Sequence, residues 1–433
     1  MKVVCTLFLL TFIGALNFLF VDLSGNYAEV KAGGLPFINA LQLAAGLFAF
    51  GTLASSPEAK AIFRRSAPVL AACGLAVVSA LWSPDPVLTI RKAMSLFFIA
   101  GLGMAVVARL GPHEALRCLL GTMTLVCLMS IAAAIISPTL AVHQETDAFQ
   151  SVHAGLWRGV LAHKVSLGIF AGLLIGLAVC AHKSYASIPL RLLAILTGAT
   201  CLVGSGSATG IVTAAIYIGV HTAGRVIVCK PEDRRRGLTL MLVAGLLVFG
   251  YILFSGLLDK FAVLLGRSPT LTGRSDYWRH IIAFIHSAAP TLGFSYAAGY
   301  KAIAPILDAR AGSMLTEAHN GYLETLVAFG YLGTPFIAAM LGITFWRSIK
   351  LVRSAPAEIA PVAVFPIAII ATNLLTSYAE SIVLMPGGIW TVAFMLGVGV
   401  LSSLENSQTT QEAREHPNAY TGSTEAYPRA TNS

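Results

Sequence analysis

A histidine stands directly before a long apolar run in the stretch EAHNGYLETLVAFGYLG at 317–333 of this 433-residue chain. Because imidazole titrates near neutral pH, His319 could accept a proton from an attacking hydroxyl group, and Glu317 could orient the ring. Asn320, the next residue, adds a further polar side chain. The simpler interpretation is an isolated histidine at the boundary between water and an apolar segment, with no role in chemistry.

An arginine in TLTGRSDYWRHIIAFI at 270–285 is the second candidate. Arg274 stands directly before Ser275 and Asp276, which are favoured N-cap residues, and apolar residues then recur at helical spacing. A guanidinium beside the free amides of a helix N-terminus is suited to binding phosphate. The alternative is that Arg274 pairs with Asp276 or with a lipid headgroup. The spacing predicts an amphipathic helix at a membrane interface.

Two shorter stretches contribute further polar groups. GLWRGVLAHKVSLG at 155–168 contains Arg158, His163 and Lys164, and snorkelling of the cations to a membrane interface is the simpler explanation for Arg158 and Lys164. GSGSATG at 204–210 contains Ser207 and three glycines. These small residues could expose backbone amides as an anion-binding nest, or could let two helices pack closely.

Acidic residues and cysteines give no sign of a metal site. No Asp-x-Asp pair or carboxylate cluster occurs in the segments expected on the outer face, so the sequence predicts chemistry without a metal or another cofactor. Glu324 and Glu380 lie within apolar segments, where we expect hydrogen bonds inside a helix bundle, and Asp85 lies between prolines, where we expect it to shape a turn. The seven cysteines lack paired spacing and are typical of small apolar packing residues.

The composition identifies the elements that must position these groups. Hydrophobic residues make up 56% of the chain and Asp, Glu, Lys and Arg only 11%, whereas a soluble domain is roughly 25% charged. A spanning helix needs about 20 mostly apolar residues. The sequence therefore predicts an all-α polytopic membrane protein with about 12 transmembrane helices, at 3–22, 35–55, 66–82, 90–108, 117–137, 160–181, 188–205, 209–224, 238–257, 320–345, 360–379 and 386–403.

Lys and Arg gather in alternate loops between these segments, which predicts that those loops and both termini face the cytoplasm. The formal net charge of +9 is concentrated there. The basic run RVIVCKPEDRRRG at 225–237 is best explained as a determinant of topology on the anionic inner leaflet. We expect no nucleic-acid partner.

Five stretches together resemble the bacterial O-antigen ligase and polymerase superfamily, particularly its exopolysaccharide polymerase branch. They occur in the order and spacing of that family, and with the pattern of spans the resemblance covers most of residues 60–400. The stretches are ALWSPDPVLTIRKAMSL at 80–96, GLWRGVLAHKVSLG at 155–168, GSGSATG at 204–210, TLTGRSDYW at 270–278 and EAHNGYLETLVAFGYLG at 317–333.

The resemblance implies a metal-independent glycosyltransferase that moves a glycan from a polyprenyl diphosphate to an acceptor sugar hydroxyl at the periplasmic face of the inner membrane. His319 would be the general base and Arg274 would hold the diphosphate. Arg158 and Lys164 would be further phosphate contacts, and the supporting residues would be His163, Asp276, Glu317, Asn320 and Ser207. The chain departs from the family at Ala208, where relatives usually have a basic residue.

The pattern of apolar spans and charges predicts four regions: an N-terminal bundle of about nine spans at 1–257, a long periplasmic loop at 258–319 that contains the amphipathic helix, about three spans at 320–404, and a disordered cytoplasmic tail at 405–433. The expected partners are a polyprenyl-diphosphate-linked oligosaccharide, an acceptor glycan and the lipid bilayer, with a chain-length regulator as a further candidate. We favour a surface or exopolysaccharide polymerase. The alternatives are an O-antigen ligase acting on lipid A core, a flippase or transporter of lipid-linked glycan, and a non-catalytic scaffold.

Overall fold

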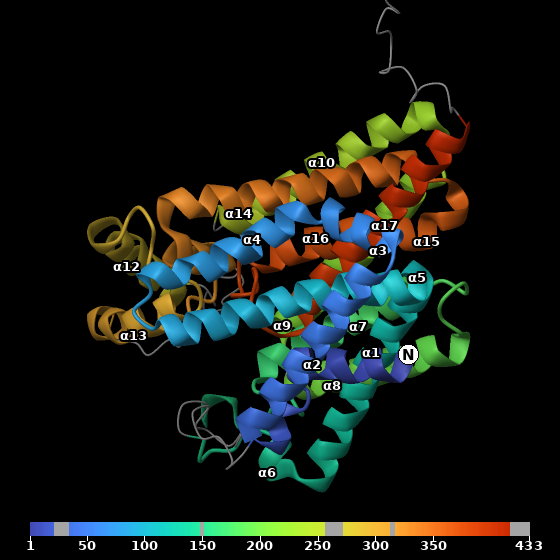
Figure 1. Cartoon of the computed structure of the whole chain (residues 1–433). Coiled ribbons are helices and arrows are strands. Elements are labelled where there is room, and N and C mark those ends of the chain that lie inside the picture. The colour runs from blue at the N-terminus through green and yellow to red at the C-terminus, as the bar shows by residue number, and fades with distance from the viewer. Residues whose placement is uncertain (21–33, 148–150, 256–271, 312–316, 416–433) are drawn as a thin grey trace, which may run out of the picture.

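The computed structural model describes residues 1–20, 34–147, 151–255, 272–311 and 317–415. Within these ranges the chain is helical and forms no β-strand, apart from one isolated bridge between Val142 and Trp157. The predicted all-α fold is therefore confirmed (Figure 1).

Helices follow one another along the whole described chain. The first half comprises α1 (Lys2–Ile13), η1 (Asn17–Leu19), α2 (Gly34–Ser55), α3 (Pro57–Arg65), α4 (Ala67–Val78), η2 (Ser79–Trp82), α5 (Pro86–Ile136), α6 (Pro138–Ala141), η3 (Ser151–His153), α7 (Lys164–Cys180) and α8 (Ile188–Ser205). The second half comprises α9 (Ala208–Val228), α10 (Glu232–Phe254), α12 (Thr272–Ala288), α13 (Ala298–Ala311), α14 (Gly321–Ser354), η4 (Ala357–Ile359), α15 (Ala360–Ala363), α16 (Phe365–Thr376) and α17 (Ile389–Glu415).

Eight of the described helices are long and apolar enough to cross a membrane, or up to nine if the bent pair of α3 and α4 forms one span. The protein is thus a multi-pass membrane protein. Each of the twelve predicted segments overlaps a helix, but the count of twelve spans is not confirmed, because α1 and α7 are shorter than a full span. Helix α5 contains two of the predicted segments, which meet at a non-helical Gly111 followed by Pro112.

The helices of the bundle differ in how deeply they are buried. Helices α16 and α17 are mostly buried, whereas α10 is almost entirely exposed at the edge of the bundle. Helix α7 packs between α8 and α9, and a Cβ atom on Gly172 would lie only 2.0 Å from the carbonyl oxygen of Gly210. Six of the seven cysteines are buried, as expected for packing residues, and Cys229 is exposed.

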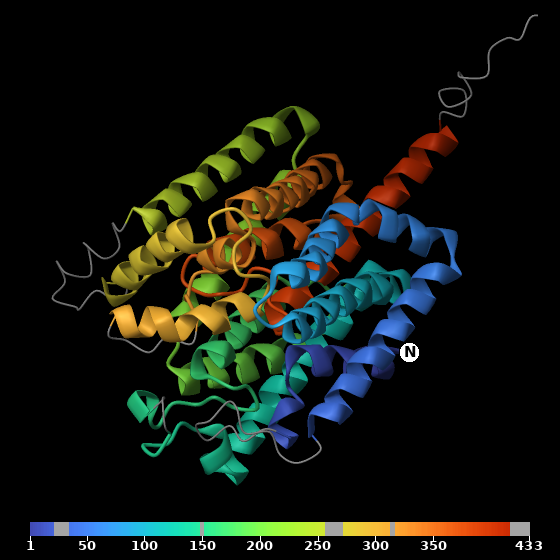
Figure 2. The ribbon, with the colours of Figure 1, turned by 60° about the vertical axis from the view of Figure 1, so that its left-hand side comes forward.

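Helices α12 and α13 form a small unit at one end of the bundle, which we call the outer end (Figures 1 and 2). They have an apolar core of their own, shared with the start of α14, that contains Tyr277, Ile281, Ile285, Ile303 and Leu307. Helix α12 corresponds to the predicted amphipathic helix, but it begins at Thr272, three residues before the expected N-cap. Helix α13 was not predicted.

Helix α14 is broken at Gly330, where the backbone φ angle is +60°. The break frees the carbonyl groups of Val327 and Ala328, and these accept hydrogen bonds from the amides of Phe294 (2.7 Å) and Ser295 (3.0 Å). A Cβ atom on Gly330 would lie 2.5 Å from the carbonyl oxygen of Thr291, so only glycine fits this approach of two backbones. The loop after α12 is thereby attached to the bundle.

Cations expected in cytoplasmic loops gather at the opposite end, which we call the inner end. The Arg347 guanidinium donates to the carbonyl oxygen of Arg65 at 2.6 Å and to Glu405, and Arg235 donates to the carbonyl oxygen of Arg353 at 2.9 Å. The start of α1 and the end of α17 lie at this same end (Figures 1 and 2). The grouping of the loops agrees with the predicted topology, and their cytoplasmic location stays a prediction.

Candidate functional site

Two pairs of the five stretches that carry the family resemblance are in direct contact, 155–168 with 204–210 and 270–278 with 317–333, and other stretches contact residues between them. The Trp82 indole donates to the carbonyl oxygen of Leu292 at 3.0 Å, and the Trp157 amide donates to that of Gly204 at 2.8 Å. The Thr209 hydroxyl is 3.5 Å from the Glu380 carboxylate. Residues far apart in the sequence therefore converge around the start of α14.

Asn320 fixes the N-terminus of α14. Its side-chain oxygen accepts hydrogen bonds from the amides of Tyr322 (3.0 Å) and Leu323 (3.1 Å), as an N-cap does, and its side-chain nitrogen donates to the carbonyl oxygen of Tyr378 (3.2 Å). The Gly321 amide donates to the carbonyl oxygens of Ser377 (2.8 Å) and Glu380. Asn320 therefore positions the histidine before it rather than offering free polar atoms.

His319 lies directly before this cap with a left-handed backbone, at a φ angle of +48°. This conformation is uncommon for a residue other than glycine and is found at functional sites when the surroundings enforce it. Here the hydrogen bonds of Asn320 on one side and of Ala318 on the other supply that restraint. The Ala318 amide donates to the Glu324 carboxylate at 2.8 Å, and the Ser381 hydroxyl donates to the same oxygen at 3.2 Å.

Two carboxylates face one nitrogen of the His319 ring. Nδ1 lies 3.3 Å from the nearer oxygen of Glu317 and 3.8 Å from that of Glu380, and the side chain keeps 20% of its surface exposed. Nδ1 is buried and makes no hydrogen bond to a described residue, but the negative charge of the two carboxylates favours a proton on this nitrogen. Nε2 is then the atom that can accept a proton from a ligand.

The same three side chains could hold a metal ion. One ligand atom from each of Glu317, His319 and Glu380 lies within 4.8 Å of the others, and among the described residues they form the one such group of three. Two carboxylate oxygens and an imidazole nitrogen suit a divalent cation such as Mn²⁺ or Fe²⁺. The expectation that the outer face has no carboxylate cluster is therefore wrong, because Glu380 comes from a different part of the chain.

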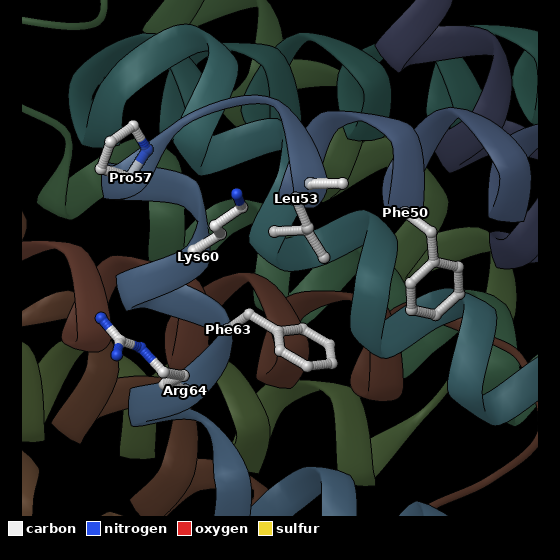
Figure 3. A pocket seen from close by; sticks show the side chains of 7 residues that line it. Phe50, Leu53, Pro57, Lys60, Phe63 and Arg64 are labelled. Carbon is white, nitrogen blue, oxygen red and sulfur yellow. The ribbon is translucent and has the colours of Figure 1, made fainter.

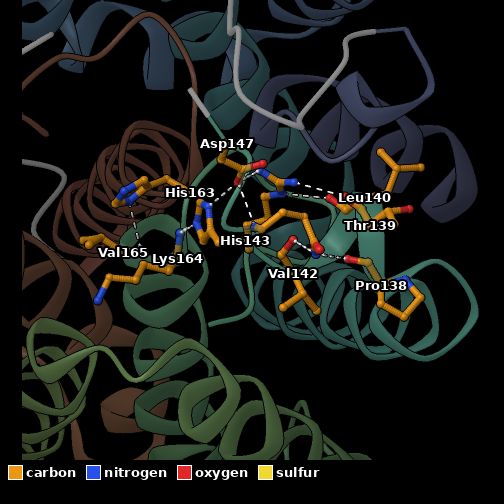
Figure 4. A network of polar contacts seen from close by, with 11 residues as sticks. Pro138, Thr139, Leu140, Val142, His143, Asp147, His163, Lys164 and Val165 are labelled. Carbon is orange, nitrogen blue, oxygen red and sulfur yellow. Dashed lines mark hydrogen bonds and ion pairs between the residues drawn. The ribbon is translucent and has the colours of Figure 1, made fainter. Parts of the chain in front are cut away.

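Arg158 is fully buried and makes its contacts within the protein. Its guanidinium donates to Asp147 at 2.8 Å and to the carbonyl oxygens of Leu140 (2.8 Å) and Thr139 (3.2 Å). Figure 4 shows Asp147 in this network, where it also accepts a contact from His143 Nδ1 at 3.2 Å. The predicted phosphate contact is corrected here, since a guanidinium with no exposed surface cannot touch a ligand.

Three histidines lie together beside this ion pair, in the loop before α7. The ring centroids of His143, His153 and His163 are 5.2–5.7 Å apart. Burial lowers the pKa of His143 to about 4 and that of His163 to about 3, so both rings are neutral at pH 7. The neighbouring charges of His143, His153 and His319 lower the pKa of His163 further.

Sequence reasoning identified only His163 of this cluster. His143, Asp147 and His153 were missed, although histidines recurring at ten-residue intervals were a usable signal. His163 Nδ1 accepts a hydrogen bond from the Val165 amide at 3.1 Å and so caps α7. Figure 4 shows the Lys164 amine directed away from the network, and the structure gives no ion pair between this lysine and any described residue.

Ser207 caps α9, because its hydroxyl accepts a hydrogen bond from the Gly210 amide at 3.2 Å. Ser207 is 5% exposed, and a Cβ atom added to Gly168 would lie 2.1 Å from the Cβ atom of Ser207. At this stretch the structure therefore shows close helix packing, the second of the two predicted alternatives.

The side chains of Arg274 and Asp276 lie outside the described part of the structure. The backbone of α12 at these positions is described, and Trp278 follows Arg274 by four residues, which is one helical turn. The Trp278 indole donates to the carbonyl oxygen of Ala318 at 2.8 Å, and its ring lies 5.5 Å from that of Tyr378. This turn of α12 is thus next to His319.

Fold and site together define a multi-pass membrane protein with a histidine and two carboxylates at one end. Residues 193–338 match the O-antigen ligase family, and this region contains three of the five resembling stretches. Over 241 residues the chain is 26% identical to the exopolysaccharide production protein ExoQ of Rhizobium meliloti (strain 1021), a match that covers 51% of this chain and 54% of ExoQ. The chain thus spans about half the length of this relative. The predicted resemblance to the O-antigen ligase and polymerase superfamily is confirmed.

Proposed function

We propose that this protein transfers a glycan from a polyprenyl diphosphate to the hydroxyl group of an acceptor sugar, at the periplasmic face of the bacterial inner membrane. The observation that carries the proposal is the environment of His319, whose Nδ1 faces two carboxylates while the side chain keeps an exposed surface. The family match to residues 193–338 supports the reaction class.

His319 acts as general base in this reaction. Nε2 accepts the proton of the acceptor hydroxyl, whose oxygen attacks the anomeric carbon of the donor sugar while the bond from that carbon to the diphosphate oxygen breaks. The electron pair of the broken bond leaves with the diphosphate. The negative charges of Glu317 and Glu380 stabilise the imidazolium that forms, and Asn320 and Glu324 hold the backbone around the histidine.

Arg274 is proposed to hold the diphosphate, where a fixed cation would stabilise the charge that develops on the leaving group. Support comes from Trp278, one helical turn further along α12, which donates to the carbonyl oxygen of Ala318 directly before His319. Lys164 is a second candidate, because its amine points away from the histidine network (Figure 4) and has no ion pair with any described residue. Arg158 takes a different role, since it positions the loop before α7.

An apolar cavity between α9 and α10 supports a donor attached to a lipid. It has a volume of about 410 Å³ and includes Gly219, Gly245 and Leu375 in its lining. Thr209, which contacts Glu380, is the second residue of α9, and α16 ends one residue after Leu375. The cavity therefore lies between helices that also reach the site, where a polyprenyl chain could be held while its diphosphate faces Arg274.

The acceptor is proposed to be a growing polysaccharide, so that the protein is a surface or exopolysaccharide polymerase. The name of ExoQ, an exopolysaccharide production protein, supports this choice. The family match supports the second candidate, an O-antigen ligase that joins the same donor to lipid A core. A chain-length regulator stays a candidate partner of the polymerase.

A deletion strain complemented with His319→Ala tests the proposal. We expect product formation to fall by about 10²–10⁴-fold, the usual contribution of a general base, with unchanged abundance in the membrane. His280→Ala is the matched control, because His280 is an exposed histidine on α12. Normal polymer length and yield in His319→Ala would overturn the catalytic role.

The glycan products of the deletion strain distinguish the remaining alternatives. Loss of long polymer with retained single repeat units indicates a polymerase, and lipopolysaccharide that lacks only its cap indicates a ligase. A flippase would instead lose lipid-linked precursor from the outer face of the membrane. A scaffold would tolerate His319→Ala.

A further inference from the structure

The bend between α2 and α3 forms a site that the proposed reaction does not use. Helix α2 ends at Ser55, and the Ser56 hydroxyl caps α3 by accepting a hydrogen bond from the Ala59 amide at 3.1 Å. Helix α3 buries Ala59 and Ile62 against the bundle. It lies at the inner end, away from α12 and α13 (Figures 1 and 2).

A cavity of about 640 Å³ opens beside this bend. Its apolar lining includes Phe50, Leu53 and Phe63, shown as sticks in Figure 3. The Phe50 ring stacks on Phe97 of α5 at 5.2 Å between ring centroids and meets Phe63 edge-on at 6.5 Å. Because aromatic contacts hold this wall in place, the cavity is a preformed apolar surface, and its volume is typical of a ligand site.

Two cations stand at the edge of the cavity. Lys60 and Arg64 line it, are exposed, and lie four residues apart on the same face of α3 (Figure 3). Glu58 lies on the other side of the helix, and in the described ranges neither cation has an ion pair or a side-chain hydrogen bond. The adjacent Arg65, by contrast, donates to Thr409 of α17 at 3.0 Å.

We propose that this cavity binds one anionic phospholipid, with its acyl chains against the aromatic wall and its phosphate between Lys60 and Arg64. An apolar surface below two unpaired cations complements an amphiphile with a net negative headgroup, and basic pockets between membrane helices recognise such lipids. Arginine and lysine can both place apolar stems along the cavity while their charges stay at the interface. This inference is independent of the proposed transfer reaction.

The test measures lipid binding to the full-length protein in mixed micelles by native mass spectrometry. The probes are dioleoylphosphatidylglycerol and dioleoylphosphatidylcholine, which carry the same acyl chains. We expect phosphatidylglycerol to bind about 30-fold more tightly, the equivalent of about 1 kcal/mol for each of two cations. Equal binding of the two lipids would overturn the proposal.

Substitution of the cations locates the binding. Lys60→Gln with Arg64→Gln removes the preference for phosphatidylglycerol. The control is Arg234→Gln with Arg236→Gln, an equal loss of charge at two exposed positions of α10 outside the cavity. We expect the control to change the affinity by less than about threefold, because an exposed charge far from the headgroup is screened. An equal effect of both double substitutions would show nonspecific attraction and refute the site.

Filling the cavity separates a lipid from a free anion. Ala54 lines the cavity and is exposed, so Ala54→Trp can occupy the space while both cations remain. We expect this variant to lose binding of phosphatidylglycerol. Retained binding would place the lipid elsewhere. Complete competition by inorganic phosphate would show that the cations bind an anion without its acyl chains, which also contradicts the proposal.

Discussion

Substitutions of Arg158 and its buried partner Asp147 test whether this arginine has a structural role or contacts a ligand. Asp147→Asn keeps an oxygen that can accept from His143, but it leaves the guanidinium without a counter-charge where it has no exposed surface. Arg158→Met instead removes the donors to the Thr139 and Leu140 carbonyl oxygens and leaves the Asp147 carboxylate without its counter-charge. We therefore expect both variants to be less stable than the wild type.

The expected loss of stability depends on which charged or polar groups each variant leaves buried without a partner. Removing one partner of a buried ion pair costs about 3–5 kcal/mol, so two independent effects would add up to about 6–10 kcal/mol. The variant that combines Asp147→Asn with Arg158→Met has no buried charge and loses mainly the donors to two carbonyl groups, each worth about 1–3 kcal/mol. We therefore expect the double variant to lose about as much stability as one of the single variants.

The assay is the apparent Tm of each purified variant, combined with its glycan product in a deletion strain. The single variants should melt several degrees below the wild type and lose product in proportion to their lower abundance. Arg236→Met, at an exposed position, is the control and should change stability by less than about 0.5 kcal/mol. If Arg158→Met keeps the wild-type Tm and abundance but makes no product, the guanidinium acts on the ligand and our structural reasoning is refuted.

Three further predictions concern pH, backbone geometry and the carboxylates. Because burial lowers the pKa of His143 to about 4, its contribution to stability is complete above about pH 6.5 and declines as the pH falls towards 4; at pH 5 the loss is about 2 kcal/mol. A Tm that is equal at pH 7.5 and pH 5 would contradict this. Gly330→Ala should destabilise the protein by about 1–3 kcal/mol because the φ angle of Gly330 is positive. The control Gly342→Ala should be tolerated, because no atom lies near the new Cβ. Equal Tm values for the two variants would refute the role of the break in α14. Glu380→Gln keeps the shape of the side chain but removes a charge that faces His319, so we expect at least about tenfold less polymer at normal membrane abundance, and full activity would exclude a role for that charge.

Hydropathy was sufficient to locate the long apolar helices, because a membrane requires long apolar segments whose backbone bonds are internal. The break in α14 could not be predicted this way. Gly330 stands inside an apolar run, and its conformation depends on hydrogen bonds to Phe294 and Ser295 from a distant loop. Helix α13 was missed because its core is shared with α12 and α14 and leaves a weak pattern in the sequence.

The candidate site was predictable only where its residues are neighbours in the chain. His319, Glu317 and Asn320 stand in one stretch, so their proximity could be expected. Glu380 enters the site from the segment after α16, and the sequence indicated only an acidic residue within an apolar segment. The role of Arg158 depends on Asp147, eleven residues earlier, and a sequence shows a charge without its buried partner.

The junction between the outer unit and the membrane bundle has a consequence for how such proteins diversify. The amides of Phe294 and Ser295 bind carbonyl groups that the break in α14 leaves open, so this part of the attachment uses main-chain atoms alone. Main-chain bonds tolerate replacement of the side chains around them. The surface of α12 and α13 can therefore change from one homologue to another, and so adapt to different sugars, while the unit stays anchored above the same histidine.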